Sequence, residues 1–176
     1  MTAVRYNTPA IALHWLTALF VIAAFVLAWV AEDADKPLRG QLMMLHKSMG
    51  LTVLGLTVLR LLNHLVNGRP APVVATPAQA TAARLTHASM HLLLIGLPLA
   101  GWMMSNAKGR VVTWFNVVAL PTLLSASESL GELLEETHEL GATVMLGLIG
   151  LHASAALWHH HKLGDDTLRR MLPGRR

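Results

Sequence analysis

The residues of this sequence best suited to do chemistry are its histidines. Ten of them occur among 176 residues, whereas cysteine is absent. Four stand in or beside apolar runs: His14, His46, His138 and His152. An imidazole ligates metal ions and titrates near neutral pH, so these side chains could hold a metal or transfer a proton. The absence of cysteine excludes disulfides, thiolate metal sites, iron–sulfur clusters and covalent haem attachment through CxxCH.

The elements that must position these histidines are hydrophobic segments. Charged residues make up 14% of the chain, about half of the roughly 25% usual in soluble domains. The segments cover about residues 11–30, 43–66, 85–104 and 138–158. A helix of about 20 residues crosses roughly 30 Å of hydrocarbon. We therefore predict an all-α fold, a four-helix transmembrane bundle, with residues 1–176 forming a single integral membrane domain rather than a soluble enzyme.

The connections between these segments differ in composition. Residues 67–83 contain three prolines and no acid, which predicts an extended surface connection. Residues 105–137 form a longer connection, in which VVTWF resembles a strand and SESLGELLEETHEL resembles a helix. We expect this connection to cap one end of the bundle. The first apolar run exceeds the roughly 7–15 residues usual in a signal peptide, so we expect it to be retained.

The distribution of charge predicts how the bundle is oriented. With four crossings, both termini and the 67–83 connection share one side. Nine of the fourteen Lys and Arg residues fall on that side, and eight of the ten acids fall on the other. The nine are Arg5, Arg60, Arg69, Arg84, Lys162, Arg169, Arg170, Arg175 and Arg176. Because basic residues are retained inside, we predict a membrane protein with both termini in the cytoplasm. Membrane orientation also explains the net charge of +4 without a nucleic-acid partner.

The helix order gives each histidine a depth. His14 lies near the inner surface on the first helix, and His46 near the outer surface on the second. On the fourth helix His138 lies near the outer surface. His152 follows 14 residues later, on the same face and about 21 Å deeper. Depth therefore predicts an outer pair, His46 with His138, and an inner pair, His14 with His152. Each pair joins two helices, as bis-imidazole ligation of a porphyrin iron requires.

Other interpretations of these histidines remain open at this point. An intramembrane histidine can instead hydrogen-bond a neighbouring helix, although ionisable groups in membrane segments are usually functional. His87 and His91, spaced i,i+4 on the third helix, lie at the inner depth and rival His14 and His152 as ligands. A histidine-rich transporter or zinc-binding membrane protein is a further alternative.

Motifs along nearly the whole chain resemble the bacterial cytochrome b561 family, and their order and spacing carry the resemblance. They are IALHW, LHKSMG, VLRLLNH, HASMHLLLIGLPLAGW, THELGATVMLGLIGLHASAALWHH and DDTLRRMLP. The resemblance implies a four-helix membrane bundle that encloses two non-covalent b-type haems. It assigns His14 and His152 to one haem iron and His46 and His138 to the other, in agreement with the depths.

The resemblance also implies an activity. The subgroup most similar to this chain consists of superoxide oxidases, which pass an electron from superoxide through both haems to ubiquinone. The expected function is therefore oxidation of superoxide to oxygen at the periplasmic side and reduction of ubiquinone at the inner side. The alternative is a haem b subunit that links the quinone pool to a separate redox partner protein.

Two further residues are candidates for this function at the inner side. The family pattern places the quinone beside the first histidine after the fourth-helix ligands, here His159, whose imidazole could donate a proton to a quinone oxygen. Arg60 lies one turn before His64 at the inner end of the second helix. It is a candidate partner for a haem propionate, or it extends to the headgroups.

The charges of the outer segments do not favour an anionic substrate. These segments carry five cations and eight acids, whereas superoxide is steered best by positive potential. We therefore expect the outer cations to cluster near the outer haem and the acids to lie elsewhere. The five cations are Lys36, Arg39, Lys47, Lys108 and Arg110.

Overall fold

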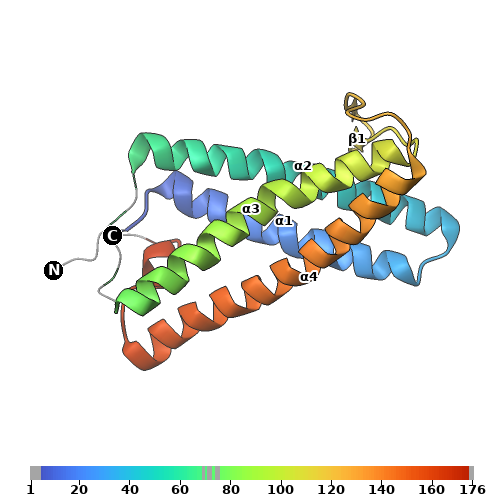
Figure 1. Ribbon diagram of the computed structural model, residues 1–176. Coiled ribbons are helices and arrows are strands. Elements are labelled where there is room, and N and C mark those ends of the chain that lie inside the picture. Colours follow the sequence, from blue (N-terminus) through green and yellow to red (C-terminus); the bar gives the residue numbers. More distant parts are fainter. Residues whose placement is uncertain (1–4, 69, 71–72, 74–75, 175–176) are drawn as a thin grey trace.

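The computed structural model describes residues 5–68, 70, 73 and 76–174. Arg69, Arg175 and Arg176, three of the cations used to predict orientation, lie outside the described residues. Four long helices run side by side: α1 (Thr8–Glu32), α2 (Lys36–Asn67), α3 (Pro77–Ala107) and α4 (Glu128–Trp158). A π-helical turn, His159–Leu163, continues α4. Figure 1 shows the resulting elongated bundle. The predicted four-helix architecture is thus confirmed.

Each helix is longer than its apolar segment. α2 has 32 residues, which gives about 48 Å of helix, more than the roughly 30 Å hydrocarbon core. The ends are set by local chemistry: the side chains of Asn7 and Asp35 accept backbone N–H groups of the first turns of α1 and α2. Thr76 and Gln79 form a reciprocal capping box at the start of α3. The extended connection predicted over 67–83 is therefore wrong for Asn67 and residues 77–83, which are helical. Residues 69, 71, 72, 74 and 75 of that connection lie outside the described residues.

The outward faces of the helices are apolar. In each of the four candidate membrane spans, at most 11% of the most apolar 18-residue window is buried inside the protein. Leucine, valine and tryptophan side chains are exposed along all four helices, with Leu19 at 61% and Leu92 at 72%. Such surface is stable only against lipid. By length and composition, the chain is a multi-pass membrane protein.

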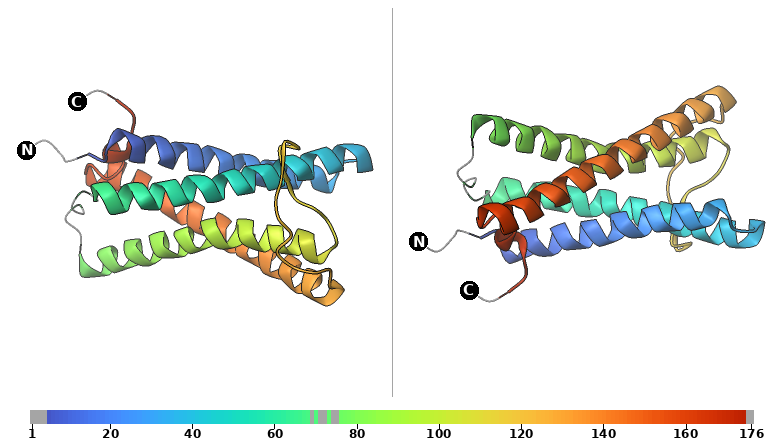
Figure 2. Two further views of the ribbon diagram at one scale, coloured as in Figure 1. Left: turned by 90° about the horizontal axis from the view of Figure 1, so that it is seen from above. Right: turned by 90° about the horizontal axis from the view of Figure 1, so that it is seen from below.

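The bundle consists of two helix pairs. α1 packs chiefly on α2, and α3 packs chiefly on α4, whereas α2 and α3 touch less extensively. Figure 2 shows α4 crossing the other helices diagonally, behind them in the left view and in front in the right view. A small apolar core of Val53, Leu94 and Met145 joins the two pairs near mid-height. Space for a ligand is therefore found between the pairs rather than within either of them.

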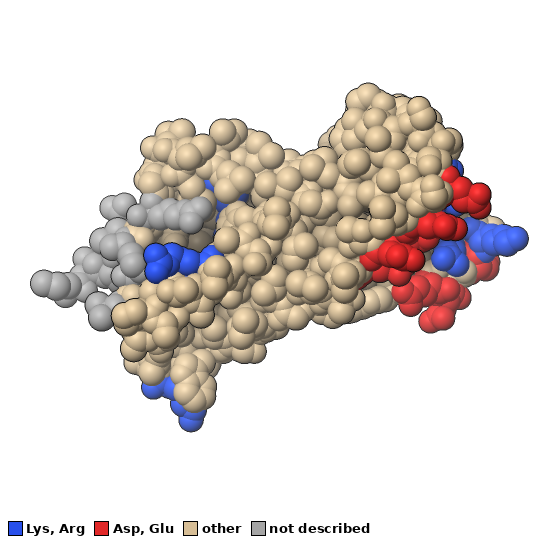
Figure 3. Space-filling view, in the orientation of Figure 1, with Lys and Arg blue, Asp and Glu red and all other residues tan. Residues whose placement is uncertain are grey.

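The two ends of the bundle are different. At one end, Arg5 donates to the backbone oxygens of Leu172 and Gly174, which joins the start of the chain to its final described residues. The α1–α2 turn lies at the other end, together with the hairpin of β1 (Thr113–Trp114) and β2 (Val118–Ala119) (Figure 1). Figure 3 shows acidic side chains gathered at this hairpin end and basic ones at both ends.

The hairpin is fastened to α2. The Trp114 indole donates to Thr52 Oγ1 at 3.1 Å, and the Phe115 amide donates to Ser48 Oγ at 2.8 Å. Phe115 and Asn116 both have positive φ, the conformation of a type I′ turn. Phenylalanine rarely adopts it, so the bond to the fully buried Ser48 offsets a local strain. The hairpin thereby packs on the face of α2 that carries Ser48 and Thr52.

Candidate functional site

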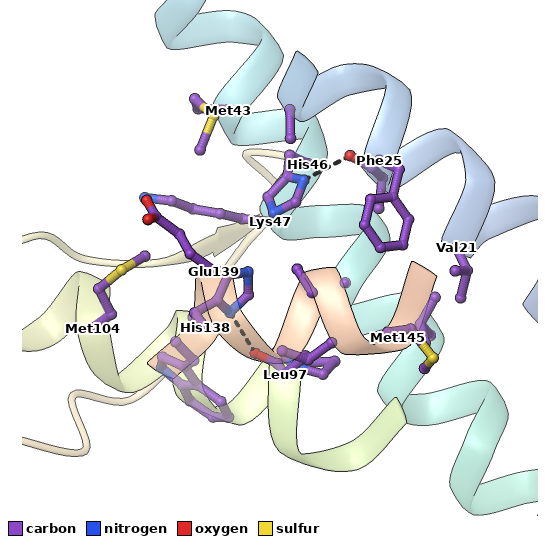
Figure 4. Close-up of a pocket in the computed structure, with 18 of the residues that line it drawn as sticks. Val21, Phe25, Met43, His46, Lys47, Leu97, Met104, His138, Glu139 and Met145 are labelled. Carbon is purple, nitrogen blue, oxygen red and sulfur yellow. Dashed lines mark hydrogen bonds between the residues drawn. The ribbon is translucent and has the colours of Figure 1, made fainter. Parts of the chain in front are cut away.

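The outer pair lies between the two helix pairs at the hairpin end. His46 on α2 and His138 on α4 have ring centroids 6.2 Å apart, with the ring planes inclined by 73°. Nδ1 of His46 lies 2.8 Å from the Ala24 carbonyl oxygen, and Nδ1 of His138 lies 3.0 Å from that of Leu97 (Figure 4). A carbonyl only accepts, so each Nδ1 carries the proton. Nε2 of each ring is then the atom with a free lone pair for a metal.

The spacing of the outer pair suits a metal ion between the rings. An imidazole nitrogen binds a transition metal at about 2 Å and lies about 1 Å from its own ring centre, so two trans imidazoles have centroids about 6 Å apart. The observed 6.2 Å meets this requirement without movement of either helix. Anchoring of a ligand imidazole through its second nitrogen to a carbonyl is the usual arrangement in metal sites.

A cavity of about 580 Å³ surrounds the outer pair and is lined by all four helices. Its volume lies in the range of about 300–1,000 Å³ typical of cofactor sites. Apolar side chains such as Val21, Phe25 and Met145 form its deeper part (Figure 4). At Gly50, which also lines it, a Cβ would meet nothing within 4 Å. The residues present thus fit a large, flat and mostly apolar group ligated by two imidazoles.

Gly101 on α3 makes room for His138. A Cβ at this position would lie 3.2 Å from Cε1 of the His138 ring, so the ring or α3 must shift by a few tenths of an ångström. We expect Gly101→Ala to lower the haem-to-protein ratio of purified protein and to alter the low-spin haem signal in electron paramagnetic resonance. Gly96→Ala on the same helix is the control, because a Cβ there would meet nothing within 4 Å. Equal haem content and spectra in the two variants would contradict this role of Gly101.

The inner pair repeats the geometry of the outer one. His14 on α1 and His152 on α4 have centroids 6.3 Å apart and planes inclined by 69°. Met145, which is 2% exposed, lies on α4 midway between His138 and His152 in sequence. With about 1.5 Å per residue, the two pairs are about 21 Å apart along the helix. The structure thus brings together both pairs that depth predicts and separates them by the apolar core.

His87 is the third histidine at the inner site. Its ring centroid lies 5.2 Å from that of His152, closer than the roughly 6 Å that two trans imidazoles require. Its side chain is exposed, whereas His14 is half-buried. His91, the other rival, bonds through Nδ1 to the His87 carbonyl oxygen of its own helix. The geometry therefore favours His14 over His87 and His91 as the partner of His152.

Arg60 lies near the inner pair. The guanidinium is half-buried, and its positive charge acts on both His14 and His152. A cation at this position can bind a carboxylate of a bound group. Of the two roles considered from the sequence, the structure favours a charge partner at the inner site.

His159 begins the π-helical turn that follows α4. Its Nδ1 lies 2.5 Å from Oδ2 of Asp165, and both side chains are mostly buried. Sequence reasoning selected His159 but missed Asp165, because six residues is not a helical contact spacing. The π-helical turn and Gly164, at φ 65°, reverse the chain and bring the two together. One feature of the sequence could have pointed to Asp165. In the predicted topology, Asp165 and Asp166 are the only acids on the side of the membrane that holds both termini.

Charges of both signs line the outer cavity. Arg39 and Lys47 are accompanied by Glu32, Glu135 and Glu139, so the expectation that the acids lie elsewhere is wrong. Lys108 forms an ion pair with Glu135 at 2.6 Å. Lys47 and Arg110 lie close enough for their positive charges to interact. Lys47 lines the cavity, whereas Arg110 acts on it from outside the lining residues.

Among the described residues, no group of three or more His, Asp or Glu side chains could hold a metal ion. His46 faces His138 and His14 faces His152 across the bundle, with His87 beside His152. This arrangement fits a porphyrin iron, whose equatorial ligands come from the cofactor, and does not support the zinc-binding alternative.

Comparisons with known proteins agree with the geometry. A family model for prokaryotic cytochrome b561 matches residues 5–174. The chain is 33% identical to "Probable superoxide oxidase CybB" of Yersinia pestis, over 98% of each chain. It is 30% identical to "Cytochrome b561 homolog 2" of Escherichia coli K12, over 97% of this chain and 93% of the relative. Identity to "Cytochrome b561 homolog 1" of the same organism is 31%, over 98% and 99%. The chain therefore belongs to the prokaryotic cytochrome b561 family, whose members are membrane electron-transfer proteins that bind b-type haem.

Proposed function

We propose that this protein oxidises superoxide to oxygen at one face of the bacterial inner membrane and reduces ubiquinone near the other. The observation that carries the proposal is the repeated histidine geometry, two facing pairs with centroids 6.2 and 6.3 Å apart on one bundle. His46 and His138 hold an outer haem b, and His14 and His152 hold an inner one. The name of the Yersinia pestis relative supports superoxide as the donor.

Both termini are cytoplasmic in this proposal, and the hairpin end faces the periplasm. The excess of Lys and Arg on the terminal side supports this orientation. The start of the chain and its final described residues meet at that end. The outer cavity then opens toward the compartment from which superoxide arrives, and His159 lies at the cytoplasmic boundary.

The overall reaction balances with two superoxide ions for each quinone. Two superoxide ions give two molecules of oxygen and two electrons, and ubiquinone takes up those two electrons and two protons to become ubiquinol. The haems, when bound, supply one-electron carriage between the two faces. The chain fixes the ligand tautomers through the Ala24 and Leu97 carbonyls. It also excludes water between the two pairs with Val53, Leu94 and Met145.

Two residues at the inner end of the bundle stabilise negative charge and transfer protons in this proposal. Arg60 supplies a positive charge beside His14 and His152 and is the proposed partner of a haem propionate. His159 is the proposed quinone ligand, which hydrogen-bonds a quinone carbonyl oxygen and donates a proton to it.

At the outer end, Lys47 and Arg110 are proposed to attract superoxide. Electrostatic steering raises association rates about 10- to 1,000-fold, so Lys47→Gln combined with Arg110→Gln should slow haem reduction by superoxide about tenfold or more. The remaining rate should depend less on ionic strength. Stopped-flow absorbance of the haem measures both effects.

The control for this pair is Lys162→Gln, which removes a cation at the opposite end of the bundle. That variant should react with superoxide at the rate of the unaltered protein. A double variant with the unaltered rate and salt dependence would exclude steering by Lys47 and Arg110.

The proposed donor is tested by recording the visible spectrum while superoxide is generated beside the purified protein. A reduced b-haem band that grows and is abolished by superoxide dismutase supports the proposal. A band that dithionite produces and superoxide does not would contradict it. The function would then be the alternative one, a haem b subunit between the quinone pool and a separate redox protein.

A further inference from the structure

The π-helical turn after α4 holds a partly buried carboxylate against His159. The His159 backbone oxygen accepts from the amides of Gly164 and Asp165. The Asp165 carboxylate in turn accepts from His159 Nδ1 at 2.5 Å. The two residues are thus joined through both backbone and side chain, which fixes their mutual orientation.

The carboxylate is itself held by a second contact. Oδ1 of Asp165 accepts the Thr167 amide at 2.8 Å, while Oδ2 faces His159. The following segment is tied to the start of the bundle, because the Trp15 indole donates to the Met171 carbonyl oxygen at 2.6 Å. The segment that carries Asp165 is therefore a packed part of the inner end.

The charge state of Asp165 is consistent with this contact. Burial raises the pKa of its carboxyl group, but the hydrogen bonds from His159 and Thr167 together lower that pKa by more. The pKa therefore lies below its ordinary value. The group is therefore a carboxylate at neutral pH. An anion at Nδ1 keeps the proton on that nitrogen and fixes the orientation of the ring.

We propose that Asp165 is the positioning residue of the quinone site, acting through His159. This inference rests on the proposed role of His159 in ubiquinone reduction. The imidazolium, held by Asp165, donates the Nε2 proton to a quinone oxygen and becomes the neutral Nδ1–H tautomer. Water on the cytoplasmic side returns that proton and supplies the second one that ubiquinol requires. Asp165 stays ionised throughout.

The test is single-turnover oxidation of pre-reduced protein by ubiquinone-1, followed at the haem band, together with steady-state kcat and KM. Loss of an outer partner of a functional imidazole typically costs about 10- to 100-fold. We expect Asp165→Asn to lower kcat by this factor with little change in KM, because an acceptor remains but the charge is lost. Asp165→Glu, which restores the charge, should recover part of the rate.

Asp166→Asn is the matched control, since Asp166 faces Arg169 at 3.6 Å rather than His159. It should leave the rate unchanged. Asp165→Asn should add no further loss to His159→Ala, because Asp165 acts only through that ring. A rate for Asp165→Asn equal to that of Asp166→Asn, or an additional loss in the double variant, would overturn the proposal while leaving the quinone site at His159 intact. Undiminished oxidation in His159→Ala alone would overturn the quinone site itself, and the inference with it.

Discussion

Replacing His46 or His138 with alanine is expected to remove one of the two proposed haems and to abolish the proposed electron transfer from superoxide to quinone. Each imidazole would supply one of the two protein ligands of that haem iron, and a cavity with a single remaining ligand would hold the cofactor poorly. Haem content should fall by about half in either variant, because the inner pair is about 21 Å away along the helix. Pyridine haemochrome analysis and a potentiometric titration measure the remaining haem and its potential.

The pairing itself gives this prediction its control. His14→Ala and His152→Ala should remove the other haem. The haem lost, identified by its midpoint potential in the titration, should therefore be the same for the two variants of one pair and different between the pairs. The facing geometry, at 6.2 and 6.3 Å, requires this pattern. Retention of two haems in His46→Ala would contradict the assignment of the histidine pairs to the haems. Loss of the haem with the same midpoint potential in His46→Ala and His14→Ala would also contradict it.

Replacing His159 with alanine is expected to slow quinone reduction by at least about 100-fold, the lower end of the contribution of a general acid. Both haems should be retained, because His159 lies two turns beyond His152 and belongs to neither pair. Reduction of the haems by superoxide should keep its normal rate, since that step occurs at the opposite end. Double-mixing stopped-flow absorbance separates the two steps.

His161→Ala is the matched control for this variant. It lies in the same π-helical turn, but its side chain is exposed. Quinone reduction at the unaltered rate is expected in His161→Ala. An equally fast reaction in His159→Ala would remove His159 from the quinone site.

The number of helices and the meeting of the histidines were predictable because the rise of a helix is constant. A 20-residue apolar run has to cross the membrane, and the position of a histidine within such a run fixes its depth. His138 and His152 share a face because 14 residues are close to four turns. The structure brings His46 to His138 and His14 to His152, as depth predicted. Depth did not separate His14 from its rivals His87 and His91.

Other features were not predictable because they depend on contacts between distant segments. The Ala24 and Leu97 carbonyls that orient His46 and His138 belong to neighbouring helices, and sequence spacing does not reveal which carbonyls face a ring. The start of α3 at Pro77 depends on the Thr76 capping box, whereas hydropathy alone locates only the apolar part of that helix. Asp165 reaches His159 through a π-helical turn, a rare form that local propensity does not predict.

The most direct measurement of the central claim is the yield of ubiquinol per superoxide consumed by the protein in vesicles that contain ubiquinone. Superoxide is generated outside the vesicles, and quinol is quantified after extraction. We predict one ubiquinol for every two superoxide ions, with no quinol formed when superoxide dismutase is present or when His46 is replaced by alanine. Superoxide consumption without quinol formation, or equal quinol formation by His46→Ala, would contradict electron transfer from the outer to the inner site.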